Sequence, residues 1–138
     1  LLPSFKDYVT QIQLNSKKLS SDLLDLDFNI VSGGTDNHLL LIDLRNKNIT
    51  GKDAETSLGK ANITVNKNMI PYDEQSPFVT SGIRIGTPAI TTRGFKEEDM
   101  GFVAQSINDA INNYENDEKL NSISDNVKKQ MKDRPLFA

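Results

Sequence analysis

Residues 82–86, with the sequence GIRIG, hold the side chain best suited to recognition chemistry. In a strand, Ile83 and Ile85 would face one way and Arg84 the other. Glycine weakens a strand, so glycines on both sides of Arg84 indicate that another group must approach the backbone. A planar guanidinium matches a carboxylate through two parallel hydrogen bonds. The pattern therefore favours an anion-binding arginine, and a structural salt bridge to the nearby acidic loop is the competing interpretation.

A polar stretch from Asn66 to Pro77 leads into the other candidates. It lacks any period, so we expect a surface loop, held by few contacts and mobile, of the kind that often carries function. The amide of Asn68 both donates and accepts, so it can pair with the edge of a heterocycle, and a turn residue is the alternative. Ser76, Pro77 and Phe78 offer a hydroxyl, a stiff bend and an aromatic face. Their alternative is a structural turn with Phe78 in the core.

Three further features are weaker candidates for a catalytic or binding site. His38 is the only histidine, and no cysteine or recognised carboxylate spacing accompanies it, so we predict neither a metal site nor a triad. Residues 32–35 (SGGT) look like a phosphate-binding loop, but a predicted strand follows them, which favours a hairpin turn. Arg93 is a second possible anion contact, and its place between a strand and a helix favours a structural role.

The composition narrows the class of protein. The 138 residues suit one domain with one core, and 36% apolar and 25% charged residues are ordinary values. A net charge of −3 argues against a nucleic-acid partner chosen by bulk charge. The lack of cysteine removes disulfides and thiolate chemistry, and no apolar run reaches membrane-spanning length. The chain starts at Leu1 and enters a helical pattern almost at once, so we expect a further region upstream.

The predicted elements place the candidate side chains on a small sheet. Apolar residues three and four apart predict a long helix within residues 1–26, capped by Ser4, part of whose apolar face packs outside this chain. Strands over 28–31 and 39–44 should pair antiparallel around a turn at 32–37. Further helices are predicted over 52–60 with Thr50 as the cap, from about 96 to 114, and over 117–132, with short strands at 63–65 and 82–86. We therefore expect an α+β domain with helices on one side of a small antiparallel sheet.

Three blocks of the sequence resemble the serine hydroxymethyltransferase family, in that family's order and spacing. They are residues 30–38 (IVSGGTDNH), 62–68 (NITVNKN) followed by Ile70 and Pro71, and 76–89 (SPFVTSGIRIGTPA) continuing through 91–95 (TTRGF). The resemblance implies an enzyme that interconverts serine and glycine, with tetrahydrofolate as the one-carbon carrier. It also implies a fold-type I pyridoxal phosphate enzyme, a homodimer or a tetramer of dimers, cytoplasmic in bacteria. Residues 1–138 would be its single C-terminal small domain, joined by its first helix to a cofactor-binding large domain.

The resemblance also assigns roles to residues. It implies that Arg84 grips the carboxylate of the amino acid, and that Asn68 and Ser76–Phe78 lie beside the folate. A pyridoxal phosphate enzyme needs a lysine for its Schiff base, and no lysine here sits in the family's context of threonines and a histidine. We therefore expect no catalytic residue and no metal in this chain, and an isolated chain that is inactive. The alternative is a free-standing, non-catalytic module that binds a carboxylate ligand or a protein partner.

Overall fold

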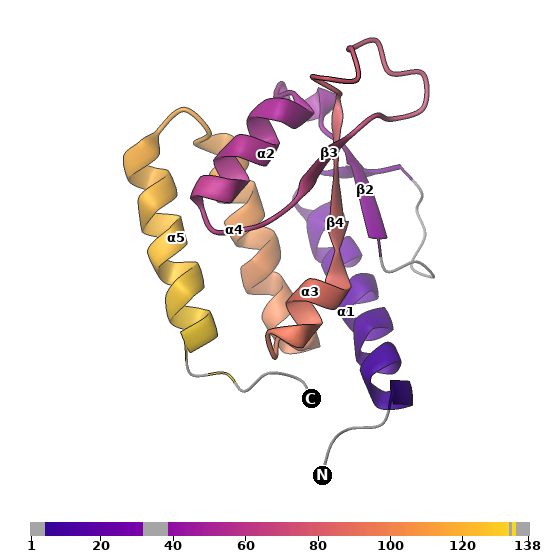
Figure 1. The fold of residues 1–138 in the computed structure, drawn as a ribbon, viewed down its shortest axis with the longest axis vertical. Coiled ribbons are helices and arrows are strands. Elements are labelled where there is room, and N and C mark those ends of the chain that lie inside the picture. The colour runs from indigo at the N-terminus through magenta and orange to yellow at the C-terminus, as the bar shows by residue number, and fades with distance from the viewer. Residues whose placement is uncertain (1–4, 32–38, 133, 135–138) are drawn as a thin grey trace.

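A computed structural model describes residues 5–31, 39–132 and 134 of the chain. Four strands and the helices around them form an α+β domain, as predicted (Figure 1). In chain order the elements are α1 (Phe5–Asp25), β1 (Asn29–Ile30), β2 (Leu39–Asp43), η1 (Arg45–Lys47), α2 (Gly51–Lys60), β3 (Asn66–Asn68), β4 (Gly82–Gly86), α3 (Thr87–Thr92), η2 (Glu97–Asp99), α4 (Met100–Asn112) and α5 (Asp117–Lys132).

The strands form one antiparallel sheet in the order β1-β2-β4-β3. Facing residues of paired strands share a side of the sheet. Leu40 pairs with Ile85 and Ile42 with Ile83, and all four side chains are buried on the core side. The opposite side carries Arg84 and stays open.

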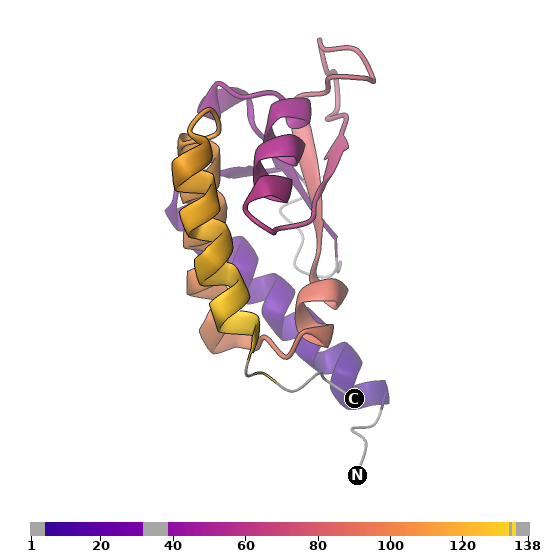
Figure 2. The same cartoon turned by 60° about the vertical axis from the view of Figure 1, so that its left-hand side comes forward.

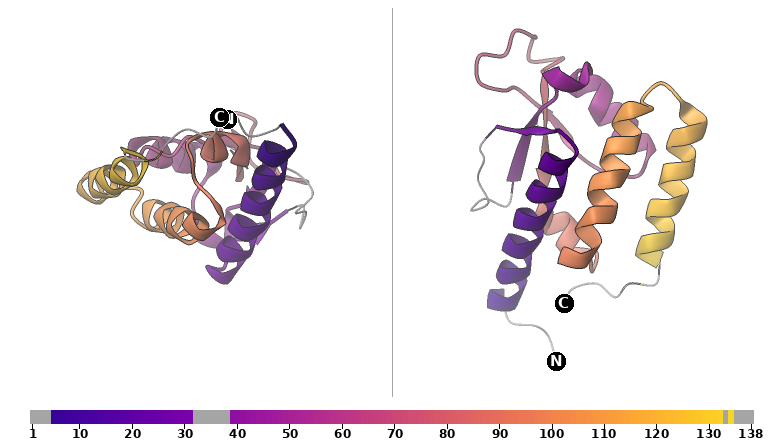
Figure 3. Two further views of the ribbon diagram at one scale, coloured as in Figure 1. Left: turned by 90° about the horizontal axis from the view of Figure 1, so that it is seen from below. Right: turned by 180° about the vertical axis from the view of Figure 1, so that it is seen from behind.

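The helices cover the core side of the sheet. The right-hand view of Figure 3 shows α1, α4 and α5 next to one another in a layer in front of the strands, and Figure 2 shows α2 between the sheet and the helices α4 and α5. Apolar side chains of these helices, such as Leu19, Leu58, Ile107 and Leu120, are fully buried in one cluster with the inner strand residues. The predicted arrangement, with helices on one side, is confirmed.

Local sequence signals explain two helices well. Thr50 caps α2, with its hydroxyl oxygen accepting from the amide of Asp53 at 3.2 Å. At the other end Asn62 takes a left-handed φ of 66°, and the amide of Ile63 closes onto the carbonyl of Leu58. The last helix, α5, has the predicted bounds, and its Leu120 and Val127 are buried.

Three expectations about the elements are wrong. Residues 63–65 are not a strand, because Ile63 completes the end of α2, and the strand β3 follows at Asn66–Asn68. That strand falls inside the predicted loop, since an edge strand with polar side chains has no apolar period to reveal it. The short helix α3 was not predicted either. It begins directly after β4, where Pro88 suits a first helical turn.

Polar groups join α1 to α3 both in the interior and at the surface. Asn15, fully buried, donates from Nδ2 to Oγ1 of Thr91 and to the carbonyl of Phe95, both at 2.9 Å. The hydroxyl of Tyr8 lies 2.7 Å from that of Thr92. The predicted apolar stripe of α1 is thus partly polar, and its first member, Phe5, is 79% exposed.

The outer edge of the sheet is closed by α2. The amide of Lys67, in the middle of β3, donates to Oε2 of Glu55 at 2.9 Å. The predicted Ser4 cap, the turn at 32–37 and His38 lie outside the described residues.

Candidate functional site

Arg84 stands on the open face of the sheet, where the pleat of β4 places it. Its neighbours Ile83 and Ile85 are 0% and 2% exposed, whereas Arg84 is exposed. The predicted alternation is confirmed. The guanidinium therefore faces solvent from a strand at the centre of the sheet, between β2 and β3.

Nearby carboxylates are already engaged. Asp43 lies on the same face as Arg84 but receives Nε and Nη2 of Arg45, the latter at 2.8 Å. The side-chain hydrogen bond from Arg45 holds the pKa of Asp43 below its ordinary value. In residues 5–31, 39–132 and 134, Arg84 makes no ion pair and no side-chain hydrogen bond. The competing interpretation, a salt bridge to the acidic loop, finds no support there.

The register of β3 brings Asn68 onto the same face. Asn66 pairs with Arg84 and Asn68 with Gly82, so Asn68 is the diagonal neighbour of Arg84, a placement that typically separates Cα atoms by about 7–8 Å. Nδ2 of Asn68 donates to the carbonyl of Met69 at 2.9 Å. Its Oδ1 accepts no hydrogen bond from any described residue, so the amide can still accept one.

The two glycines that flank Arg84 differ in how much space surrounds them. A Cβ on Gly82 would lie 2.7 Å from Cγ2 of Ile70 and 2.8 Å from the carbonyl oxygen of Ile42. The space at Gly82 is thus filled by the protein itself. A Cβ on Gly86 would meet nothing closer than Cδ2 of Leu39, at 3.4 Å. The predicted close approach of another group is thus confirmed at Gly82, where that group belongs to the protein itself, and it is not seen at Gly86.

The turn Ser76–Phe78 is fully on the surface. Its backbone closes locally, because the amides of Val79 and Thr80 both donate to the carbonyl of Ser76. Phe78 is 80% exposed, so the alternative that places it in the core is wrong. The ammonium of Lys67 donates to the carbonyl of Phe78 at 2.8 Å and ties the turn to β3. No hydrogen bond between described residues joins this turn to Arg84.

The far side of the turn rests on the first residues of α2. The amides of Gly51 and Lys52 donate to the carbonyls of Thr80 and Val79, at 3.1 and 2.9 Å. Thr80 holds a left-handed φ of 60°, which a β-branched residue rarely adopts. A Cβ on Gly51 would overlap Oγ1 of Thr80 at 2.0 Å, so the helix approaches this closely only because residue 51 is glycine.

Asp73 organises the loop between β3 and β4. Its Oδ1 accepts from the amide of Gln75 (2.9 Å) and the hydroxyl of Ser81 (2.7 Å). Its Oδ2 accepts from the amides of Ile70 (3.2 Å) and Ser81 (2.8 Å). Burial would raise the pKa of Asp73, but these four hydrogen bonds together lower it to about 2. The expectation that few contacts hold this loop is wrong.

The sequence pattern did not single out Asp73. Its only local signal is an aspartate in a polar loop, whose side chain often bonds the amide two residues on. The bonds to Ser81 span eight residues with no period between them, so the sequence does not reveal them. Lys67 was missed for the same reason.

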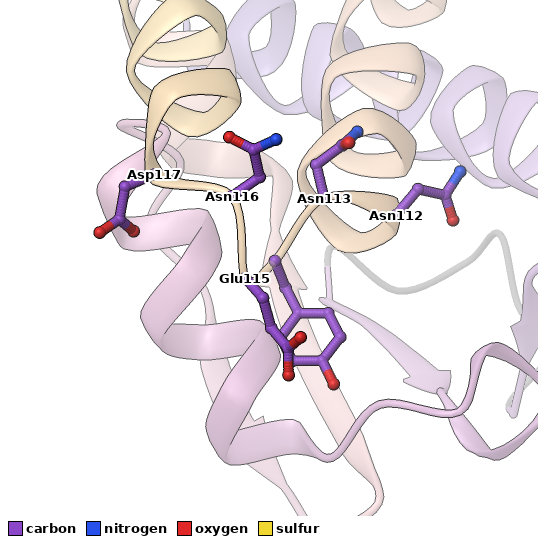
Figure 4. A pocket seen from close by; sticks show the side chains of 6 residues that line it. Asn112, Asn113, Glu115, Asn116 and Asp117 are labelled. Carbon is purple, nitrogen blue, oxygen red and sulfur yellow. The ribbon is translucent and has the colours of Figure 1, made fainter.

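Other features of the molecule lie apart from this face. Arg93 lines a hollow of about 200 Å³ on the helix side of β4, together with Ile85, so it faces away from Arg84. A polar hollow of about 400 Å³ lies at the turn between α4 and α5, among Asn112, Asn116 and Asp117 (Figure 4). It contains none of the predicted site residues.

The described part of the chain lacks two other features. No group of three or more histidine, cysteine, aspartate or glutamate side chains is placed to hold a metal ion there. None of the described helices is both long and apolar enough to cross a bilayer.

The sequence matches a model of a known protein family. The model described as serine hydroxymethyltransferase matches residues 1–107. The match includes β3, β4, the loop between them and Arg84, and it ends inside α4.

Proposed function

The chain belongs to the serine hydroxymethyltransferase family, and from this premise we propose that it recognises the substrates of such an enzyme. The reaction we propose interconverts serine plus tetrahydrofolate with glycine, 5,10-methylenetetrahydrofolate and water. One observation carries the proposal: Arg84 is an exposed guanidinium on an open sheet face, with no ion pair among the described residues.

Arg84 would bind the carboxylate of serine or glycine. Its planar fork can donate two parallel hydrogen bonds to the two carboxylate oxygens, which fixes the orientation of the amino acid. β4 is rigidly placed, since Ile83 and Ile85 are buried on either side of Arg84. The arginine therefore meets its ligand from a fixed backbone.

Asn68 and the Ser76–Phe78 turn would contact the folate. The free Oδ1 of Asn68 can accept a hydrogen bond from a heterocycle, and the exposed ring of Phe78 offers a face for stacking. Ser76 and Pro77 are exposed at the same turn. The bond from Lys67 to Phe78 keeps these two parts of the folate wall beside each other.

Pyridoxal phosphate does not fit the residues of this chain alone. The cofactor of this family supplies the electron sink for the chemistry and needs a Schiff-base lysine. The strands offer only Lys67, which pairs with Ile83 and so lies on the side of the sheet away from Arg84. We therefore propose that another region of the enzyme provides the lysine and the phosphate contacts. This chain would be inactive by itself.

The place of this chain in the complete enzyme is also a proposal. We propose that residues 1–138 form one C-terminal domain, and that α1 joins it to the cofactor-binding domain. The exposure of Phe5, at 79%, supports a contact for the first turn of α1 outside this chain. We further propose a cytoplasmic homodimer or tetramer for the complete enzyme.

Serine binding to Arg84 variants tests the proposal in the complete enzyme. Arg84→Ala should weaken serine binding by about 2–5 kcal/mol, because a bound carboxylate loses its charged partner. Arg84→Lys should recover little, since one ammonium cannot reproduce the fork. Arg93→Ala is the matched control, because it removes an arginine that faces away from Arg84. Normal serine affinity in Arg84→Ala would refute the assignment.

A further inference from the structure

We propose that Asp73 is a positioning residue for tetrahydrofolate, which without touching the ligand fixes the Ser76–Phe78 turn relative to Asn68. The inference rests on the proposed function, since it assumes that these residues contact folate. The proposal adds that one carboxylate in the loop sets the relative positions of the folate-contacting residues.

The carboxylate joins the two ends of the loop. Ile70 comes two residues after β3 ends, and Ser81 immediately precedes β4. The Oδ2 atom of Asp73 accepts from both of their amides, at 3.2 and 2.8 Å. The side chain thus closes the loop at its base, just beyond the last paired residues of the two strands.

The same carboxylate sets the path toward the turn. Its Oδ1 accepts from the amide of Gln75, the residue before Ser76, at 2.9 Å. The backbone reverses just before Asp73, where Tyr72 has a left-handed φ of 57°. Such a conformation persists only where the surroundings enforce it. Asp73 holds this conformation through its two carboxylate oxygens and through its amide, which donates to the carbonyl of Ile70.

The rest of the turn is supported by other elements. Val79 and Thr80 rest on the first amides of α2, and the carbonyl of Phe78 receives the ammonium of Lys67. Residues 71–75 make no hydrogen bond to a described helix, so their geometry depends on the bonds of Asp73. A loop ordered in advance spares the ligand the cost of ordering it, and that saving appears as affinity.

Asp73→Asn in the complete enzyme is the direct test, with tetrahydrofolate and serine titrated separately. The amide keeps the size of the side chain, but its NH₂ cannot accept the two bonds that one oxygen now accepts. We expect tetrahydrofolate to bind about tenfold more weakly. Serine affinity should stay within about twofold, because β4 and its buried isoleucines are untouched. Glu74→Gln is the control, since it removes the same charge from the adjacent exposed position.

A second variant keeps the test decisive if Asp73→Asn folds poorly. Ser81→Ala removes one of the four bonds, the hydroxyl bond of 2.7 Å, and should weaken tetrahydrofolate by about threefold with serine unchanged. Wild-type folate affinity in both variants would overturn the inference. So would an equal loss of serine and folate affinity, which indicates a general structural role. If the wild-type enzyme itself does not bind tetrahydrofolate, the proposed function fails instead.

Discussion

At the scale of residues, Gly82 and Gly86 both flank Arg84 but differ in how closely the protein packs around them. The missing Cβ of Gly82 leaves space that Ile70 and two carbonyl oxygens occupy, whereas Gly86 borders only the end of Leu39. Backbone oxygens of a paired strand cannot move aside as a flexible side chain can. Gly82 is therefore required by packing next to the arginine, and Gly86 is not.

This difference gives a prediction about stability. Gly82→Ala should lower the free energy of unfolding by about 1–3 kcal/mol, because the added methyl overpacks against Ile70 and the carbonyl of Ile42. Gly86→Ala should change it by less than about 0.5 kcal/mol. Urea denaturation of the two variants measures both values. Equal changes in the free energy of unfolding would show that close packing does not require glycine at position 82.

At the scale of elements, the loop between β3 and β4 depends on the ionised form of Asp73. Its pKa is about 2 in the folded chain, below the ordinary value near 3.9 in an unfolded one. A depressed pKa means that the folded state favours the carboxylate. The contribution is therefore present above about pH 4 and is lost as the pH falls toward 2. The nearby charges of Asp43, Arg45 and Glu74 act on the same region.

The pH dependence can be measured as a difference between two proteins. At pH 7 the wild type should be more stable than Asp73→Asn by on the order of 1–2 kcal/mol, after allowance for solvent screening of a partly exposed group. The difference should shrink as the pH is lowered from about 4 to about 2. Thermal unfolding at several pH values reports it, and a difference that stays constant down to pH 2 would contradict the role of the charge.

The elements also show what the sequence can and cannot predict. The alternation in β4 and the apolar spacing of α5 are local and periodic, and both predictions are confirmed. β3 is polar and lies at an edge, and α3 is six residues long, so neither has enough period to be recognised. The face shared by Arg84 and Asn68 depends on strand register, which pairing across the loop decides. The exposure of Phe78 depends on the folded surface, and no property of the residue itself predicts it.

At the scale of the whole molecule, the sheet face that carries Arg84 and Asn68 has no lysine among the strand residues that share it. We predict that isolated residues 1–138 bind pyridoxal phosphate weakly and do not turn over serine, because we propose that another region of the enzyme provides the Schiff-base lysine. An absorbance titration with the cofactor should show no stoichiometric band of a lysine-bound form. Borohydride reduction followed by mass spectrometry is the control for hidden attachment. Trapping of one cofactor on a single lysine would contradict this division of the enzyme.

The bond between Glu55 and the amide of Lys67 has a consequence for association between molecules. The outer strand of a sheet normally presents free amides that can accept a strand from another chain, the first step toward fibres. In β3 the outward amide is already used by a carboxylate from α2, and the strand is only three residues long. The domain can therefore keep the sheet face that carries Arg84 open to solvent without exposing, at this edge, a template on which copies of itself could polymerise.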